Sequence, residues 1–371
     1  MNPCEAIPFN YMGNLAQWAK SNCVPLSGTF ELTPFCNFQC VMCYVRLTKE
    51  QAAQQGEMLR AADWIAIAKQ AKDMGMLNLC LTGGEPFTHP DFWEVYSELN
   101  KMGFLISILS NGYLIDEEVI AKFKIYGAPF CMKLTLYGAS DETYLRTCHC
   151  KDGFTKISKA TELLREANIP FKMTSTVVKE NADDLQEIYR FARERNIPMQ
   201  HTISVVKSSR GATNTAEESR LTVCDYSEEL TLDVLEKNKY PDLCSPFAWC
   251  GSYRSSFWMT WNGHFQLCSF MSRPFVPYSG DLAADWAVLN GKLRNLHSPK
   301  ECEDCTWRSF CQRCPGILCA ESGDPESVDP SLCDAARRLY ELYMAKQNEE
   351  GPKNEKEIYP TRKPALCDES Y

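Results

Sequence analysis

The sequence predicts an α/β fold, in which a partial (β/α)6 barrel of the TIM type is followed by a small, cysteine-rich α+β domain. Two observations lead to this prediction. Between residues 29 and 206, short apolar runs alternate with amphipathic stretches, a pattern typical of a parallel sheet covered by helices. Between residues 244 and 333, cysteines accumulate and long periodic segments are scarce. We therefore expect the functional residues in loops at the carboxyl ends of the barrel strands.

The elements of the barrel follow from the apolar periodicity. We expect strands over 29–33, 77–82, 104–109, 130–136, 171–178 and 198–205. The helices between them are expected over 58–75, 91–102, 116–126, 154–168 and 183–196. About six β/α units of this kind make an open or incomplete barrel.

The remaining segments are assigned from composition. Residues 1–28 are an irregular extension too short to form a domain, and residues 207–243 are a linker and helix that begins with a connector rich in Ser, Thr, Arg and Asn. The cysteine-rich domain covers 244–346 and is closed by a helix over 334–346. The tail 347–371 is charged and contains proline, so we expect it to be disordered.

Charge and hydropathy exclude two classes of partner. The net charge of −9 argues against nucleic acid, because phosphate binding needs a cationic surface. The chain has no run of about 18 apolar residues, so we expect no membrane span. The first residues lack a basic segment followed by an apolar one, so we expect no export signal and a cytoplasmic protein.

The sequence contains 20 cysteines, and metal binding is the leading explanation for them in a large chain of this kind. Cys36, Cys40 and Cys43 follow the first predicted strand on a loop. A [4Fe–4S] cluster normally takes four thiolates, so three leave one iron open for another ligand. A zinc knuckle is the alternative, since soft thiolates also select zinc.

The CxxxCxxC spacing resembles that of the radical S-adenosylmethionine (SAM) enzymes. The resemblance implies that the open iron takes the amino and carboxylate groups of SAM, and that electron transfer gives a 5′-deoxyadenosyl radical. Met42 occupies the place before the third cysteine, where relatives often carry an aromatic residue near the adenine, and Tyr44 follows that cysteine. We assign both to cofactor binding.

Three further loops follow in the order expected for that family. Gly83, Gly84 and Glu85 end the second strand and resemble the motif that contacts the methionine amino group, with Ser110 and Asn111 after the third strand at the ribose position. Arg146 stands where relatives pair an arginine with the SAM carboxylate, a surface arginine being the alternative. Asn181 resembles the polar end of the family's fifth strand.

The second set of cysteines resembles the SPASM extension of radical SAM enzymes, which holds two auxiliary [4Fe–4S] clusters. The turn at 261–263 suits a hairpin flanked by cysteines. By analogy, the first auxiliary cluster takes Cys250, Cys268 and Cys314, with Cys244 as a fourth ligand and Cys319 as the alternative to Cys314. The second takes Cys302, Cys305, Cys311 and Cys333. Two zinc sites are the alternative reading of this segment.

Other candidates are less specific. Cys80 and Cys131 fit packed strand positions, whereas Cys148 and Cys150 lie just after Arg146, where a redox or substrate-tethering role is an option. His201 and His264 are candidate proton carriers, with purely structural histidines as the alternative. The sequence alone assigns no residue as the catalytic acid or base.

The resemblance implies a substrate class. SPASM relatives mostly modify peptides, so we expect hydrogen abstraction from a peptide substrate that leads to a crosslink, a thioether or epimerisation. The expected partners are a reductant such as flavodoxin or ferredoxin and, because residues 1–28 are too few for a leader-binding domain, a separate leader-peptide-binding protein. The alternatives are a small-molecule alcohol or sugar dehydrogenase, an anaerobic sulfatase-type maturase, for which Ser269 replaces the aspartate base of relatives, and a non-catalytic iron–sulfur carrier.

Overall fold

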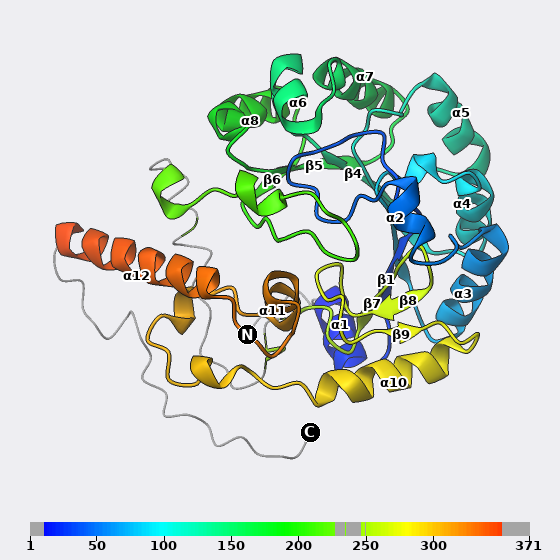
Figure 1. Cartoon of the computed structure of the whole chain (residues 1–371). Helices are drawn as coiled ribbons and strands as arrows, with labels where there is room; N and C mark the ends of the chain where they lie inside the picture. The colour runs from blue at the N-terminus through cyan, green and yellow to red at the C-terminus, as the bar shows by residue number, and fades with distance from the viewer. Residues whose placement is uncertain (1–10, 227–233, 235–245, 249, 351–371) are drawn as a thin grey trace, which may run out of the picture. The chain divides into compact units, whose positions relative to one another are not determined.

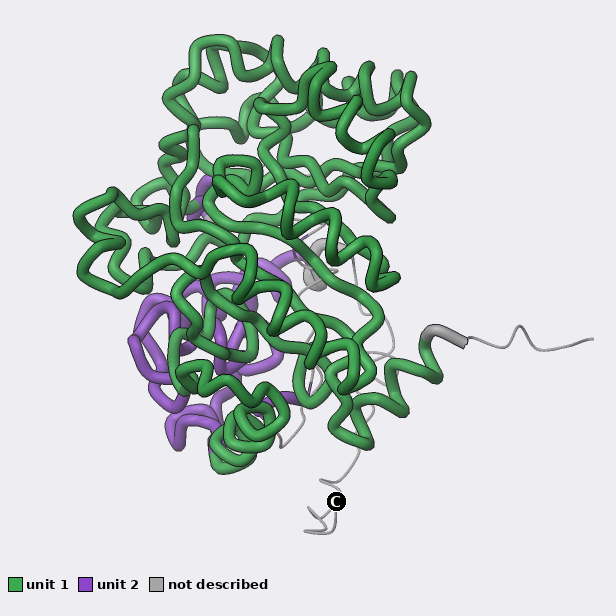
Figure 2. The backbone as a smooth tube through the Cα atoms, turned by 90° about the vertical axis from the view of Figure 1, so that its right-hand side faces the viewer, with its two compact units in different colours: residues 1–220, 251–295 green, residues 221–250, 296–371 purple. Residues whose placement is uncertain are grey.

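A computed structural model describes residues 11–226, 234, 246–248 and 250–350 of the chain. Its residues form two compact units: residues 1–220 with 251–295, and residues 221–250 with 296–371 (Figure 2). Among the described residues, every helix is too short or too polar to pass through a lipid bilayer. The functional domains predicted from the sequence stay a prediction, because compactness describes packing and not function.

The first unit is built on one nine-stranded sheet with the order β6-β5-β4-β3-β2-β1-β7-β8-β9. The first six strands are parallel and confirm the predicted α/β barrel sheet. They are β1 (Ser27–Glu31), β2 (Asn78–Thr82), β3 (Leu105–Ser110), β4 (Cys131–Thr135), β5 (Phe171–Thr176) and β6 (Met199–Thr202). Each lies within two residues of its predicted bounds, except that β6 ends three residues early, at Thr202.

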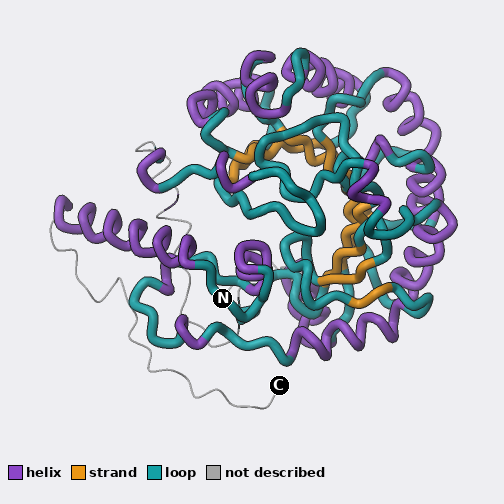
Figure 3. Tube along the Cα trace, viewed as in Figure 1, coloured by secondary structure: helices purple, strands orange, loops and turns teal. Residues whose placement is uncertain are grey.

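Helices cover the outer face of this curved sheet, and the strands form its inner arc (Figures 1 and 3). They are α3 (Ala61–Asp73), α4 (Phe92–Lys101), α5 (Glu117–Tyr126), α6 (Asp141–Cys148), α7 (Gly153–Glu166) and α8 (Leu185–Glu194). The apolar residues that set the periodicity fill the interface, among them Phe30, Trp64 and Leu81, none of which is exposed. The short α2 (Lys49–Ala53) and α6 were not predicted, because each is too short to show a period.

The sheet continues beyond the barrel strands. β7 (Ser256–Met259) pairs in parallel with β1, and β8 (His264–Gln266) and β9 (Val276–Pro277) follow antiparallel. The predicted hairpin is thus present, and Gly263 takes the positive φ of 80° that its turn requires. Because β7 joins β1, the hairpin belongs to the first unit.

Two segments differ from the sequence predictions. The extension 1–28 is not wholly irregular, because it forms α1 (Tyr11–Asn22), with the Ala19 side chain fully buried and the Ser21 carbonyl accepting a hydrogen bond from Arg254. The sequence of this helix has only a weak amphipathic pattern, and tertiary packing stabilises it. The cysteine-rich region also contains α10 (Leu282–Arg294), a 13-residue helix in the first unit.

The second unit contains α11 (Pro315–Ser322) and α12 (Pro330–Glu350), linked by short turns. The predicted closing helix is therefore present but longer than expected. Residues 347–350 continue α12 instead of starting the disordered tail, and residues 351–371 of that predicted tail lie outside the described residues.

Candidate active site

The three-cysteine loop lies at the carboxyl end of β1, as predicted. Its backbone is held by α6, because the amides of Gln39 and Val41 donate to the carbonyls of Cys148 (3.1 Å) and Thr147 (2.9 Å). The loop therefore keeps its shape through hydrogen bonds to residues about 100 positions later in the chain.

The thiols of this loop lie close enough to influence one another. Burial raises the pKa of the Cys36 thiol, and the charges of Glu85, Cys40 and Cys43 raise it further. Burial and Cys40 likewise raise the pKa of Cys43. Three partly buried thiolates at close range repel one another unless cations join them, so this donor set fits an iron–sulfur cluster.

Two glycines bring the loop after β2 against the cysteine loop. The Gly84 amide donates to the Thr33 carbonyl (2.7 Å), and the Glu85 amide donates to the Phe35 carbonyl (2.8 Å). A Cβ atom at Gly84 would lie 2.3 Å from the Phe35 oxygen, and one at Gly83 would lie 2.7 Å from the Thr33 oxygen. Only glycine permits this approach of two backbones.

Glu85 lies at the centre of the site. Its carboxylate is fully buried and accepts hydrogen bonds from Ser110 Oγ (2.9 Å) and the Asn111 amide (2.8 Å). Burial raises its pKa to about 7, although these hydrogen bonds favour the charged form. A buried carboxylate with unused lone pairs is suited to receive an ammonium group.

The loop after β3 joins Glu85 to the cysteine loop. The Asn111 side-chain amide donates to Asn37 Oδ1 (2.8 Å) and lies 3.6 Å from Cys36 Sγ. The structure thus brings together the residues predicted from three separate loops: Cys36, Glu85, Ser110 and Asn111. The strand order explains this, because parallel neighbours end at the same edge of the sheet.

The second unit gathers another set of thiols. Burial raises the pKa of Cys311 to about 12, and the charges of Cys302, Cys333 and Cys305 add to this effect. Burial also raises the pKa of Cys302, with the charges of Cys333 and Cys305 adding to the effect, and burial and the charge of Cys305 raise the pKa of Cys333. These four cysteines are the predicted ligands of the second auxiliary cluster.

The predicted first auxiliary set is described only in part. Burial raises the pKa of Cys314, and the charge of Cys250 raises it further, so these two thiols lie near each other in the second unit. Cys319 is buried in α11 with 2% exposure. Cys268 belongs to the first unit, and Cys244 lies outside the described residues. The four-ligand set stays a prediction.

No group of three or more His, Cys, Asp or Glu side chains in the described part of the chain is arranged to hold a single metal ion.

Comparison with known proteins agrees with this geometry. Residues 30–192, which contain the cysteine loop, Glu85 and the β3 loop, match the Radical SAM superfamily. Over this segment the chain is similar to the radical SAM enzymes. The match ends at α8 and leaves the hairpin and the second unit outside it.

Named relatives match the radical SAM segment. The sequence is 28% identical to the AdoMet-dependent heme synthase of Methanosarcina barkeri over 163 residues, 44% of this chain and 46% of that protein. It is 28% identical to the PqqA peptide cyclase of Gluconobacter oxydans over 168 residues, 45% of this chain and 46% of that protein. It is 26% identical to the subtilosin biosynthesis protein AlbA of Bacillus subtilis over 44% of this chain and 36% of AlbA. The match thus spans less than half the length of each of these relatives.

Solved structures share the fold over more of the chain. Streptococcus suis SuiB bound to S-adenosylmethionine superimposes with a TM-score of 0.63 at 18% identity, covering 87% of this chain and 80% of SuiB. The protein anSMEcpe with bound AdoMet also gives a TM-score of 0.63 at 18% identity, covering 87% of this chain and 98% of that one. These structures confirm the predicted fold class, a radical SAM partial barrel followed by an antiparallel region.

Met42 and Tyr44 occupy different surroundings in the radical SAM segment. Met42 is buried in an apolar cluster with Val178 and Val205, after β5 and β6. The Tyr44 ring lies 5.3 Å from that of Phe270, and its hydroxyl hydrogen-bonds to Ser269. Their assignment to cofactor binding stays a prediction.

Arg146 and Asn181 have internal partners. The Arg146 guanidinium donates to the Glu180 carbonyl (3.2 Å) and lies 3.4 Å from the Asp183 carboxylate, with its side chain 41% exposed. Its proposed contact with the SAM carboxylate is untested. The buried Asn181 side chain bonds to the Tyr137 carbonyl (2.8 Å) and to the Val178 amide (2.8 Å), so its amide shapes the loop after β5.

Two features of the site were not predicted as such. The fully buried Cys148, given only as a redox or tethering option, lies near Cys40, and burial together with Cys40 raises the pKa of its thiol. Glu31, at the end of β1, is buried and paired with Arg210, whose Nη1 lies 2.8 Å from its carboxylate. The sequence did contain a signal for this pair. A glutamate stands at the end of an apolar strand, and a buried charge needs a partner.

Proposed function

We propose that this chain is a radical SAM peptide maturase. It binds a [4Fe–4S] cluster through Cys36, Cys40 and Cys43, cleaves SAM reductively, and abstracts a hydrogen atom from a peptide to give a crosslink, a thioether or an epimerised residue. The observation that carries this proposal is the buried Glu85 carboxylate, held by Ser110 and Asn111 beside the Cys36 thiol.

The chain's own residues would bind and orient the cofactor. Cys36, Cys40 and Cys43 would hold the cluster, and Glu85 would accept the ammonium of SAM. When bound, the cluster and SAM supply a 5′-deoxyadenosyl radical. Gly83 and Gly84 keep the Glu85 loop against the cysteine loop, so the carboxylate is positioned before SAM arrives.

The peptide substrate is supported by the relatives. The PqqA peptide cyclase carries a name that states peptide chemistry, AlbA is named for the biosynthesis of the bacteriocin subtilosin, and SuiB has been solved with its precursor peptide SuiA. By the same resemblance, two auxiliary [4Fe–4S] clusters would take up the electron left after bond formation. The charges of Cys302, Cys305 and Cys333, which raise the pKa of Cys311, support one of these clusters.

The ligand choice near α11 favours Cys314 over Cys319. Cys314 caps the helix and lies near Cys250, whereas Cys319 is buried within the helix. A flavodoxin or ferredoxin would supply the electron, and a separate protein would bind any leader peptide. Against sulfatase-type maturation, Ser269 stands in the place of the base, and its hydroxyl is engaged by Tyr44.

The test is a cofactor assay on the full chain. After anaerobic reconstitution, the protein is incubated with SAM and dithionite, and 5′-deoxyadenosine is measured by mass spectrometry alongside iron, sulfide and the electron paramagnetic resonance spectrum of the reduced cluster. We expect 5′-deoxyadenosine from the wild type and none from the Cys36→Ala/Cys40→Ala/Cys43→Ala variant.

A matched control removes a thiol outside the site. Cys131, on β4, belongs to none of the predicted ligand sets, so Cys131→Ala should retain both iron and product. Bound zinc without iron, or a wild-type protein that yields no 5′-deoxyadenosine, would overturn the proposed function.

A further inference from the structure

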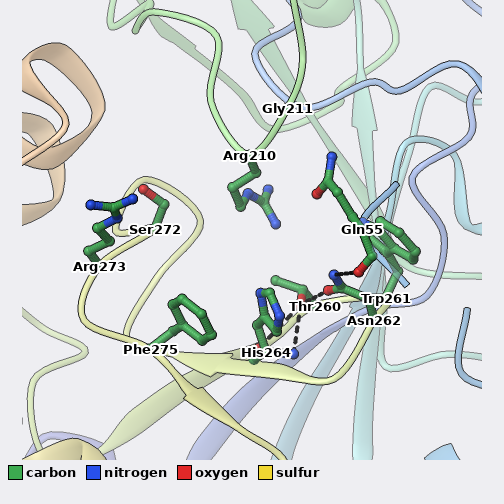
Figure 4. Close-up of a pocket in the computed structure, with 10 residues that line it drawn as sticks. All are labelled: Gln55, Arg210, Gly211, Thr260, Trp261, Asn262, His264, Ser272, Arg273 and Phe275. Carbon is green, nitrogen blue, oxygen red and sulfur yellow. Dashed lines mark hydrogen bonds between the residues drawn. The ribbon is translucent and has the colours of Figure 1, made fainter. Parts of the chain in front are cut away.

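A cavity of about 320 Å³, lined by both polar and aromatic side chains, lies in the first unit, between the loop after β6 and the β7–β8 hairpin (Figure 4). It lies at the same edge of the sheet as the cysteine loop, because β1 and β7 run parallel and both end there. This volume is within the range of roughly 300–1,000 Å³ that is usual for ligand pockets. The residues lining it include Arg210 and Arg273, and none of them is acidic.

Arg210 extends from the loop above the cavity towards its interior (Figure 4). One side of its guanidinium is engaged, because Nη1 lies 2.8 and 2.9 Å from the two oxygens of the buried Glu31. Trp258 Nε1 donates a further hydrogen bond to that carboxylate, at 2.8 Å. The Glu31 charge is therefore neutralised inside the protein, and Glu31 does not line the cavity.

The other edge of the same guanidinium has no hydrogen-bond partner in the described part of the chain. That edge consists of Arg210 Nε and Nη2, which are both buried. Buried donors of a cation are costly to leave unpaired, so this edge is prepared for an acceptor. Elsewhere in the molecule, Arg60 uses these same two atoms to hold the Asp91 carboxylate, at 2.6 and 2.9 Å.

The remaining walls suit an organic anion. Arg273 supplies a second cation, and the ring of His264 stacks on Phe275 at 4.2 Å. Burial and the nearby Arg210 lower the pKa of His264, so its imidazole is neutral near pH 7. Trp261 adds an apolar surface at the other side.

Hydrogen bonds connect one wall of the cavity to the candidate active site. The loop that carries Arg210 bonds to the cysteine loop twice: the Ser209 amide donates to the Tyr44 carbonyl (2.9 Å), and the Asn214 side chain donates to the Cys43 carbonyl. A group bound by Arg210 would therefore be held at a fixed position relative to Cys43.

We propose that this cavity is a substrate subsite that binds a peptide carboxylate through the Nε–Nη2 edge of Arg210, assisted by Arg273. The carboxylate belongs either to an acidic side chain or to the peptide's C-terminus, since both present the same planar acceptor pair. This inference rests on the proposed function for its choice of a peptide. It deepens that function, because it assigns a cationic anchor for the substrate on a loop that is bonded to the cysteine loop.

The test measures binding without any radical chemistry. Isothermal titration of the reconstituted full chain with SAM, in the absence of reductant, uses N-acetylglutamate α-methylamide for an acidic side chain and N-acetylalanine for a C-terminus. N-acetylglutamine methylamide is the neutral control, and inorganic phosphate is the competing anion. We expect at least one carboxylate probe to bind about tenfold more tightly than the neutral one, and the stronger of the two identifies the source.

Three variants locate the binding. Arg210→Lys keeps a charge for Glu31 but removes the planar edge, so carboxylate affinity should fall about tenfold. Arg273→Gln, on an exposed loop, should lower it by about threefold. Arg190→Gln, on α8 and 58% exposed, is the matched control and should leave it unchanged. If Arg210→Lys fails to fold by circular dichroism, Arg273→Gln decides.

Three results would overturn the subsite: equal binding of the neutral probe, tighter binding of phosphate, or carboxylate binding that survives in Arg210→Lys, or in Arg273→Gln where that variant decides. The proposed function fails separately. A chain that binds the carboxylate through Arg210 but makes no 5′-deoxyadenosine keeps the subsite and loses the radical chemistry, and the converse result loses only the subsite.

Discussion

The chain gathers thiols in two regions that are built differently. The loop at 36–43 is held from outside, by backbone hydrogen bonds to α6 and by the loop after β6. The cysteines at 302–311 lie instead on short local turns, where the amides of Cys302 and Cys311 donate to carbonyls three residues earlier, at 2.9 and 3.2 Å. Only Cys333 comes from a distant element, α12.

This difference indicates different roles. A site assembled from several strand ends can place a carboxylate, an amide and thiols around one ligand, as Glu85, Asn111 and Cys36 show. A site made of turns and one helix gathers four thiols, with the Arg313 cation acting on Cys302 and Cys311. The first arrangement suits a cluster that binds a substrate-like cofactor, and the second suits a cluster that only carries electrons.

Removal of the second set of thiols gives the largest effect that tests this comparison. Cys302→Ala/Cys305→Ala/Cys311→Ala should lower iron by about four atoms per chain, because one cubane is lost. The variant should still make 5′-deoxyadenosine with dithionite, since the site around Glu85 is intact. Iron analysis and mass spectrometry check this, and loss of 5′-deoxyadenosine in this variant would contradict the division of roles.

Replacing one glycine in each region by alanine separates the cost of a backbone contact from the cost of a backbone conformation. Gly84→Ala would press a Cβ against the Phe35 carbonyl, so we expect a loss of about 3 kcal/mol in the free energy of unfolding. Gly323, which ends α11 with φ of 84°, has open space around it. Gly323→Ala should therefore cost only about 1 kcal/mol, from the left-handed backbone alone.

Urea unfolding of both variants measures the difference. Gly291→Ala, inside α10 and with no atom near its Cβ position, is the matched control and should be neutral or slightly stabilising. Equal losses for Gly84→Ala and Gly323→Ala would show that the two loops of the active site do not depend on close approach.

The pH dependence of SAM binding gives the finest test of the first region. Because burial raises the pKa of Glu85 to about 7, its carboxyl group is mostly charged at pH 8 and mostly neutral at pH 6. The ammonium of SAM binds the charged form, so affinity should rise as the pH rises through 7. Glu85→Gln should weaken binding about tenfold at pH 8 and much less at pH 6.

Equilibrium dialysis of reconstituted protein at the two pH values provides the measurement. Glu50→Gln, an exposed carboxylate on α2, serves as the control and should follow the wild type. A Glu85→Gln variant whose affinity deficit is the same at both pH values would refute the role of the carboxylate charge.

Much of the fold could be predicted because its signals are local. The barrel strands are apolar runs between amphipathic helices, and Gly83, Gly84 and Glu85 come directly after one of them. Since parallel strands end at one edge, the order of motifs along the chain was enough to predict that Cys36, Glu85 and Asn111 meet.

Other features could not be predicted because they depend on contacts between distant segments. Helix α1 is stabilised by packing, with Ala19 buried and Arg254 bonded to the Ser21 carbonyl. No periodicity in the sequence predicts the parallel pairing of β7 with β1, which places the hairpin in the first unit.

The spacing of three thiols and the residues at strand ends are properties of neighbouring positions, so the linear chain alone carried the resemblance to the radical SAM enzymes. The pairing of Glu31 with Arg210, 179 positions apart, was decided only by folding. That pairing leaves one edge of a buried cation without an acceptor, and the reason is physical: charge balance inside a protein is settled by which segments meet, not by which residues are adjacent.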